Sequence, residues 1–283
     1  MMRVLVIGLA ALLLTAPAMA QTRFVATVMG QGPDVVLIPG LASSDDVWDA
    51  TVEQLSATHR VHTLQVKGFA GEPAGPNADG PVLEPLVEEV AAYAAKLEKP
   101  AIIGHSLGGL MAIKIAAKHA ASVDRIMVVD ALPFYALLFA PTATVEMVKP
   151  QADMLRTQTI AMTDEQFAAG QDRTMAMLVK SEAARAAPTQ WSLKSDRKVM
   201  ATAMYEDMLT DTRPLLPQIK AKTTVVYAYE AQMGRPAEFA DGMYAKAYEG
   251  LAGVKLKRID GGFHFIMLDK PEAFAKEVDA FLK

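Results

Sequence analysis

The sequence predicts an α/β fold in which a mostly parallel central sheet is flanked by helices, and an all-helical cap follows the strand that ends at Asp130. Three observations carry this prediction. Short apolar runs rich in β-branched residues alternate along the chain with segments of helical periodicity. The stretch 134–217 contains no convincing strand. A glycine-flanked serine, Ser106, lies between a predicted strand and a predicted helix.

Length and composition indicate a globular protein with one main core. The chain has 283 residues, of which 52% are hydrophobic and 21% are charged, as is typical of a folded domain. The formal net charge is −4 and no block of Lys and Arg is present, so we expect no nucleic-acid partner. The absence of cysteine excludes disulfides, zinc–thiolate sites and a cysteine nucleophile.

The N-terminus has the pattern of a secretory signal peptide over residues 1–20. Arg3 precedes an apolar run, Val4 to Leu14, and Ala18-Met19-Ala20 supplies small residues at the two positions that a signal peptidase reads. An uncleaved anchor or a buried first strand is the alternative, but the run is too short for a bilayer core of about 30 Å. We expect cleavage after Ala20, a periplasmic or secreted protein, and no stable membrane insertion after cleavage.

The order of predicted elements divides the mature chain into a core and an insertion. We expect strands at 24–29, 35–38, 60–66, 101–104, 125–129, 223–229 and 254–259. We expect helices at 83–97, 107–119, 236–248 and 271–282. The core then comprises residues 21–133 and 218–283, and residues 134–217 form the helical cap.

The most specific motif is Gly104-His105-Ser106-Leu107-Gly108, which matches the G-x-S-x-G nucleophile elbow. An elbow places serine on a tight turn from a strand into a helix, and its neighbours must be small. The predicted strand and helix provide that context. The alternative is a glycine-rich turn that opens an ordinary helix.

Further motifs accompany the elbow, and together they resemble the α/β-hydrolase fold family in its capped, esterase-like branch. The resemblance covers essentially the whole mature chain. Pro39 departs from the family pattern, because many members have His there. The matching runs are Ile38-Pro39-Gly40-Leu41, Gly68-Phe69-Ala70-Gly71, Gly104 to Gly109, Arg213-Pro214-Leu215-Leu216-Pro217 and Gly262-Phe263-His264.

The resemblance implies a base and an oxyanion hole for Ser106. The family order along the chain is Ser, acid, His, and His264 is the one histidine of five that obeys it. Its loop follows the last predicted strand. The oxyanion donors are expected to be the N–H of Leu107, directly after the nucleophile, and the N–H of Leu41. The alternatives are a loop histidine without a role and a plain strand-to-loop turn.

The acid is less well specified. In most of the family it follows the strand at 223–229, where Gln232 occupies the corresponding position here. A neutral amide cannot stabilise imidazolium as a carboxylate does. Asp130 and Glu230 are the two substitutes, and we favour Asp130. The alternatives are a strand-end turn residue and a solvated loop carboxylate, respectively.

This machinery predicts acyl transfer, and above all the hydrolysis of carboxylic esters. We expect no metal site and no cofactor, because Ser106 explains the chemistry by itself. The expected partner is an apolar small-molecule acyl compound. Phe134, Tyr135 and Leu138 are candidates for its binding site, although they can simply pack the cap on the core. No feature indicates an oligomeric state.

The same sequence allows two other classes of function. A lactonase or a C–C bond hydrolase would use the same machinery on a different bond. A binding protein that kept the fold and lost catalysis is the third reading, and Gln232 is the feature that supports it. The helical cap contains a set of flexible apolar side chains suited to an adaptable pocket: Met147, Met154, Met162, Met175, Met177, Met200, Met204 and Met208.

Overall fold

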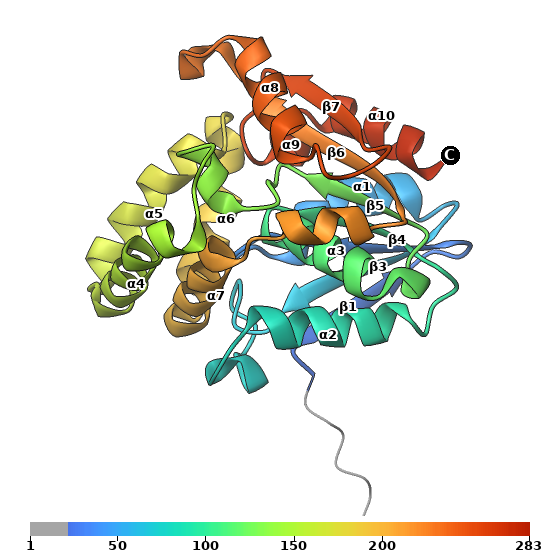
Figure 1. The fold of residues 1–283 in the computed structure, drawn as a ribbon. Helices are drawn as coiled ribbons and strands as arrows, with labels where there is room; N and C mark the ends of the chain where they lie inside the picture. Colours follow the sequence, from blue (N-terminus) through green and yellow to red (C-terminus); the bar gives the residue numbers. More distant parts are fainter. Residues whose placement is uncertain (1–21) are drawn as a thin grey trace, which may run out of the picture.

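The central sheet has seven strands in the order β1-β3-β2-β4-β5-β6-β7. The computed structural model of the chain describes residues 22–283, so the predicted signal segment lies outside the described residues. β1 is antiparallel to β3, and all other neighbours are parallel, which confirms the predicted mostly parallel sheet (Figure 1). The strands are β1 (Phe24–Met29), β2 (Asp34–Ile38), β3 (Arg60–Val66), β4 (Ala101–His105), β5 (Arg125–Val129), β6 (Lys222–Tyr229) and β7 (Lys255–Asp260).

Both faces of the sheet are apolar, and each face is covered by helices. In β2, Val36 and Ile38 join one cluster of buried side chains, whereas Val35 and Leu37 join another on the opposite face. This follows from the two-residue period of a strand that is buried on both sides. The first cluster includes side chains of α2 (Leu83–Ala94), α3 (Leu107–Lys118) and α8 (Ala237–Ala247). The second includes those of α1 (Asp49–Leu55), α9 (Ile266–Asp269) and α10 (Pro271–Leu282).

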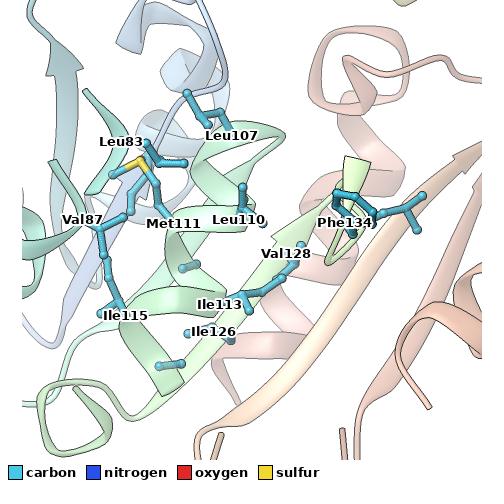
Figure 2. Close-up of a cluster of buried hydrophobic side chains, with 14 of the residues drawn as sticks. Leu83, Val87, Leu107, Leu110, Met111, Ile113, Ile115, Ile126, Val128 and Phe134 are labelled. Carbon is cyan, nitrogen blue, oxygen red and sulfur yellow. The ribbon is translucent and has the colours of Figure 1, made fainter. Parts of the chain in front are cut away.

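Helix α3 lies at the centre of the first cluster. Figure 2 shows Leu110, Met111 and Ile113 of α3 among side chains of α2 and β5. All three are almost completely buried. A helix that is apolar around most of its circumference is typical of a core element. Because α3 begins at the residue after Ser106, this packing fixes the turn that carries the serine.

A helical insertion lies between β5 and β6, as predicted. In Figure 1 its four helices stand together beside the sheet. α4 packs on α7, and α5 packs on α6. Local capping defines their starts: Thr163 and Gln166 form a capping box, and the Asp196 carboxylate accepts the N–H of Val199. The helices are α4 (Val145–Ala161), α5 (Asp164–Leu178), α6 (Glu182–Lys194) and α7 (Arg197–Leu209).

The methionines of the insertion do not all face one pocket. Met147, Met154 and Met177 are at least half exposed, so these three point to solvent. Met175 and Met200 are buried. The expectation that the set lines a pocket is therefore wrong for the three exposed members. Within residues 22–283, no helix combines the length and the apolar character needed to span a bilayer.

Candidate active site

Ser106 lies on a strained turn between β4 and α3. Its backbone angles are φ 53° and ψ −120°, in a region that residues other than glycine rarely adopt. Its N–H donates to the carbonyl of Val129 over 2.9 Å, which ties the turn to β5. The serine is the N-cap of α3, so the positive end of the helix dipole points at it. This is the geometry that the elbow motif predicts.

The glycines of the motif are required by close backbone contacts. A Cβ atom on Gly104 would lie 2.1 Å from the carbonyl oxygen of Gly108. A Cβ atom on Gly108 would lie 2.3 Å from the carbonyl oxygen of Ile38. Both distances are far inside van der Waals contact, so neither position can take a side chain without movement of the backbone. The two glycines therefore hold β4, α3 and the end of β2 together around Ser106.

The loop after β2 lies against the elbow, where the oxyanion donors were expected. A Cβ atom on Gly40 would lie 3.1 Å from Cβ of Ser106. Leu41 follows in a turn closed by the N–H of Ser43 and the carbonyl of Gly40. Among residues 22–283, neither the Leu41 N–H nor the Leu107 N–H donates to a protein acceptor. Both amides are thus available to a ligand oxygen.

His264 and Asp130 form a hydrogen-bonded pair at the same edge of the sheet. Nδ1 of His264 lies 2.7 Å from Oδ2 of Asp130. Asp130 directly follows β5 and adopts a left-handed φ of 48°, which Asp tolerates better than most residues. Its Oδ1 accepts the backbone N–H of Ala228 over 2.9 Å. The structure therefore brings together the histidine and the carboxylate that the sequence favoured.

The alternative acid, Glu230, is engaged elsewhere. Its Oε2 forms an ion pair with Nζ of Lys180 from the helical insertion, and its Oε1 accepts the N–H of Gln232 over 3.2 Å. The Lys180 ammonium group, helped by that N–H, holds the pKa of Glu230 below its ordinary value. Gln232 is exposed. Neither side chain is hydrogen-bonded to His264 in the described residues.

Two residues that support this pair were not identified from the sequence. The phenol of Tyr244 on α8 donates to Oδ1 of Asp130 over 3.1 Å. Burial, together with the Asp130 charge, raises the pKa of Tyr244 well above its ordinary value, so the hydroxyl stays protonated and keeps donating. A buried tyrosine usually has a hydrogen-bond partner for its hydroxyl group. A tyrosine on the buried face of the predicted helix was therefore the available sequence signal for this contact.

His105 is the second supporting residue. Its ring is fully buried, and Nε2 donates to the carbonyl oxygen of His264 over 3.1 Å. Burial lowers the pKa of His105 well below its ordinary value, and the nearby His264 adds to this effect. The ring centroids of the two histidines lie 4.5 Å apart. Because His105 directly precedes Ser106, this contact places the His264 loop beside the elbow.

Asp207 on α7 is a further carboxyl group near the site. It is partly buried, and within residues 22–283 its carboxyl oxygens make no hydrogen bond to another residue. Burial raises the pKa of Asp207 to about 7, although the charge of His264 acts in the opposite direction. One and two turns earlier on the same helix face, Ala203 and Met200 are buried, and Met200 belongs to the same small apolar cluster as Leu41 and Ala42 of the loop after β2. Asp207 therefore faces inward from the insertion.

The three side chains expected to bind substrate lie in different environments. Phe134 is fully buried and packs under the guanidinium group of Arg213, which matches the packing alternative. Burial raises the pKa of Tyr135 above its ordinary value, and the charge of the nearby Asp207 adds to this effect. Leu138 is half exposed and lines a hollow of about 550 Å³ with Phe239 and other residues of α8. That hollow is not lined by Ser106 or His264.

Comparison with known proteins identifies the family. Residues 35–277 match the family model described as "Alpha/beta hydrolase family". The chain belongs to this family. The match spans both the elbow and the His264 loop, and it confirms the resemblance that the sequence motifs indicated. Among residues 22–283, no group of three or more His, Asp or Glu side chains is arranged to hold a metal ion.

Individual relatives of this alpha/beta hydrolase match either part of the chain or the whole chain at low sequence identity. A pimeloyl-(acyl-carrier protein) methyl ester esterase from Vibrio atlanticus (strain LGP32) is 36% identical over 114 residues, which cover 40% of this chain and 42% of that protein. The match thus spans about two fifths of that relative. The enol-lactonase from Burkholderia xenovorans LB400 superposes with a TM-score of 0.73 at 20% identity, covering 92% of this chain and 96% of that one. An esterase from Exiguobacterium antarcticum superposes with a TM-score of 0.73 at 19% identity, covering 92% of this chain and 95% of that one. These superpositions show a shared fold.

Proposed function

We propose that this alpha/beta hydrolase is a serine hydrolase that cleaves carboxylic esters of small apolar acyl compounds. Ser106 is the nucleophile, His264 the general base and Asp130 the acid. The observation that carries the proposal is the 2.7 Å contact between Nδ1 of His264 and Oδ2 of Asp130. A carboxylate can only accept here, so Nδ1 carries the proton and Nε2 is left as the basic nitrogen.

The acylation step follows from this assignment. Oγ of Ser106 attacks the ester carbonyl carbon while its proton passes to Nε2 of His264. The carbonyl π electrons move to oxygen, and the resulting oxyanion accepts the N–H groups of Leu41 and Leu107. Asp130 stabilises the imidazolium that forms. Collapse of the tetrahedral intermediate expels the alcohol, which takes the proton back from Nε2.

Deacylation repeats the same steps with water. Nε2 of His264 takes a proton from the water molecule as its oxygen attacks the acyl-enzyme carbonyl. The second oxyanion uses the same two N–H donors. Its collapse releases the carboxylic acid and returns the proton to Oγ of Ser106. The strained backbone of Ser106 supports this role, because strain of this kind is typical of nucleophiles held at the start of a helix.

An apolar acyl group is supported by the side chains around the oxyanion loop. Leu41 and Ala42 cluster with Met200 and Phe167 of the insertion. The relatives named pimeloyl-(acyl-carrier protein) methyl ester esterases suggest a substrate with a linear acyl chain. The match covers about two fifths of the length of these relatives. We therefore place medium-chain acyl esters, including methyl esters, ahead of lactones and diketones as substrates.

A fluorophosphonate probe tests the nucleophile directly. The folded protein is expected to react at one site. Mass spectrometry should find the adduct on the peptide that contains Ser106. Ser106→Ala should abolish labelling at unchanged melting temperature. An intact protein that never reacts would end the hydrolase assignment and leave the non-catalytic binding reading.

A substrate panel then tests the bond that is cleaved. It comprises p-nitrophenyl and methyl esters of acyl chains from two to ten carbons, aryl esters, lactones and vinylogous diketones. We expect the highest kcat/KM for medium acyl or aromatic esters. A preference for a lactone or a diketone by more than about tenfold, a difference of 1.4 kcal/mol in transition-state binding, would reassign the reaction to lactone or C–C bond hydrolysis.

We also infer that the protein is exported. The supporting feature is the signal pattern over residues 1–20, with its small residues before Gln21. Expression of the full sequence in a Gram-negative host should yield periplasmic or secreted protein. Its intact mass should correspond to a chain that begins at Gln21. Protein recovered only in the cytoplasm with residues 1–20 attached would contradict export.

A further inference from the structure

The backbone around His264 is held at three successive positions. The N–H of Phe263 donates to Oδ2 of Asp269 over 2.8 Å. The carbonyl of His264 itself accepts from His105, as described above. The N–H of Phe265 donates to the carbonyl of Leu178 over 3.1 Å. Leu178 is the last residue of α5, so one of the three partners belongs to the helical insertion.

Asp269, at the end of α9, joins the same two parts of the molecule. Besides the Phe263 N–H, its carboxylate accepts the N–H of Lys180 over 3.0 and 3.1 Å and the N–H of Ser181 over 3.0 Å. Ser181 is the N-cap of α6, and its own side chain makes no capping bond. The Asp269 carboxylate therefore caps the start of α6 from outside the insertion, where negative charge is favoured by the helix dipole.

Side chains reinforce this junction between α5 and α6. The ammonium group of Lys180 pairs with Glu230, on the loop that follows β6. Val179 is fully buried in the same apolar cluster as Phe265. The Arg185 side chain donates to the carbonyls of Val179 over 2.7 Å and Lys180 over 3.0 Å. The junction is thus a fixed contact between the insertion, the loop after β6 and the loop that carries the proposed base, His264.

We propose that Asp269 is a positioning residue for His264, and that it sets the place of the imidazole relative to Ser106 by fastening the His264 loop to the α5–α6 junction. This inference rests on the proposed role of His264 as the base. The carboxylate accepts N–H groups from both sides, so its loss frees the loop and the insertion together. Displacement of a catalytic group by about 1 Å can lower turnover by about 100-fold.

The test compares Asp269→Ala with Glu272→Gln in the full chain. Glu272 is an exposed carboxylate three residues away, for which no hydrogen bond is recorded within residues 22–283. For a short p-nitrophenyl ester, Asp269→Ala should lower kcat by about 100-fold and change KM by less than threefold, because the substrate contacts remain. The acidic limb of the kcat–pH profile should also move, which a purely structural loss would not cause. Glu272→Gln should match wild type.

Lys180→Gln provides a second variant if Asp269→Ala does not fold. It weakens the same junction from the side of the insertion and leaves Asp269 in place. We expect a loss in kcat of about fivefold, the scale of a partly exposed ion pair, with the same movement of the acidic limb. A folded Asp269 variant, or Lys180→Gln, with the kcat and pH profile of wild type would overturn the inference. Failure of the proposed function would be seen earlier and separately, as a wild-type protein without esterase activity or fluorophosphonate labelling.

Discussion

The phenol of Tyr244 donates a 3.1 Å hydrogen bond to Oδ1 of Asp130, the carboxylate whose other oxygen faces His264. Oδ1 also accepts the N–H of Ala228, so the anion is fixed by two donors besides the imidazole. The Tyr244 ring is held in turn by stacking on Tyr227, with centroids 4.1 Å apart. Partners of this kind orient a carboxylate and stabilise its charge.

Tyr244→Phe should therefore weaken catalysis without much effect on binding. The change removes one hydrogen bond to a charged group, worth about 1.5 kcal/mol, so kcat should fall by about tenfold at unchanged KM. Tyr248→Phe is the matched control. The Tyr248 phenol donates to the carbonyl of Ala131 over 2.7 Å and does not bond to the carboxylate, so its kcat should stay near wild type. Equal losses in both variants would assign Tyr244 to packing alone.

Substitution of the two candidate acids should separate them clearly. Asp130→Asn should lower kcat by about 10⁴-fold, because the amide neither stabilises imidazolium nor fixes the correct tautomer of His264. Glu230→Gln breaks the pair with Lys180, and its loss should stay below about tenfold. Steady-state kinetics on one ester measure both variants. Near-normal turnover of Asp130→Asn, or the larger loss in Glu230→Gln, would reverse the assignment of the acid.

The elements that the sequence predicted well are those with local signals. Ser106 was identifiable because small residues, a strand and a helix are all within a few positions of it. The parallel sheet followed from the alternation of short apolar, β-branched runs with helical segments along the chain. Helix α1 was missed, because its seven residues at Asp49–Leu55 are too few to show a helical period.

The supporting contacts of the site depend on distant parts of the chain. Tyr244 is 114 residues from Asp130, and Asp269 is 89 residues from Lys180. Apolar periodicity shows which helix face is buried, but it does not show which loop lies opposite that face. The choice between Asp130 and Glu230 had the same origin, because β5 and β6 are neighbours and both loops leave the same edge of the sheet. The position of Asp207 near His264 could not be predicted from the sequence for the same reason.

Asp207 should make the stability of the fold depend on pH near neutrality. Its folded-state pKa of about 7 lies above the ordinary 3.8, so the fold favours the neutral acid. This contribution is complete below pH 4 and is lost as the pH rises to 7, a change of up to about 4 kcal/mol. Asp207→Asn carries no such dependence. Its gain in free energy of unfolding over wild type should be small at pH 4 and largest at pH 8, as measured by urea unfolding.

Asp172→Asn is the control for that experiment, because Asp172 is exposed on α5. Its difference from wild type should be small at every pH. If the advantage of Asp207→Asn is the same at pH 4 and pH 8, the carboxyl group has the same pKa in the folded and the unfolded chain, and its inward placement is wrong.

Asp34 should give the opposite dependence at low pH. Asp34 lies at the start of β2, and its carboxylate accepts hydrogen bonds from Nε and Nη2 of Arg60, over 2.5 Å to Oδ1 and 2.9 Å to Oδ2. Nε2 of His62 lies 2.9 Å from Oδ1. The Arg60 hydrogen bonds, against the effect of burial, lower the Asp34 pKa from 3.8 to about 2. The ionised pair therefore stabilises the fold by about 2 kcal/mol above pH 4, and this is lost as the pH falls towards 2.

Asp34→Asn should lower the free energy of unfolding at pH 7 by at least this amount, because it also leaves the charge of Arg60 without its buried partner. The difference from wild type should shrink below pH 4, as the wild-type carboxylate is protonated. Asp79→Asn is the matched control, since Asp79 pairs with Lys198 at an exposed site and its loss should leave stability close to wild type. Activity should survive in both variants, because Asp34 lies at the end of the sheet opposite Ser106. A difference for Asp34→Asn that does not shrink at low pH would show that packing, and not the ion pair, is responsible.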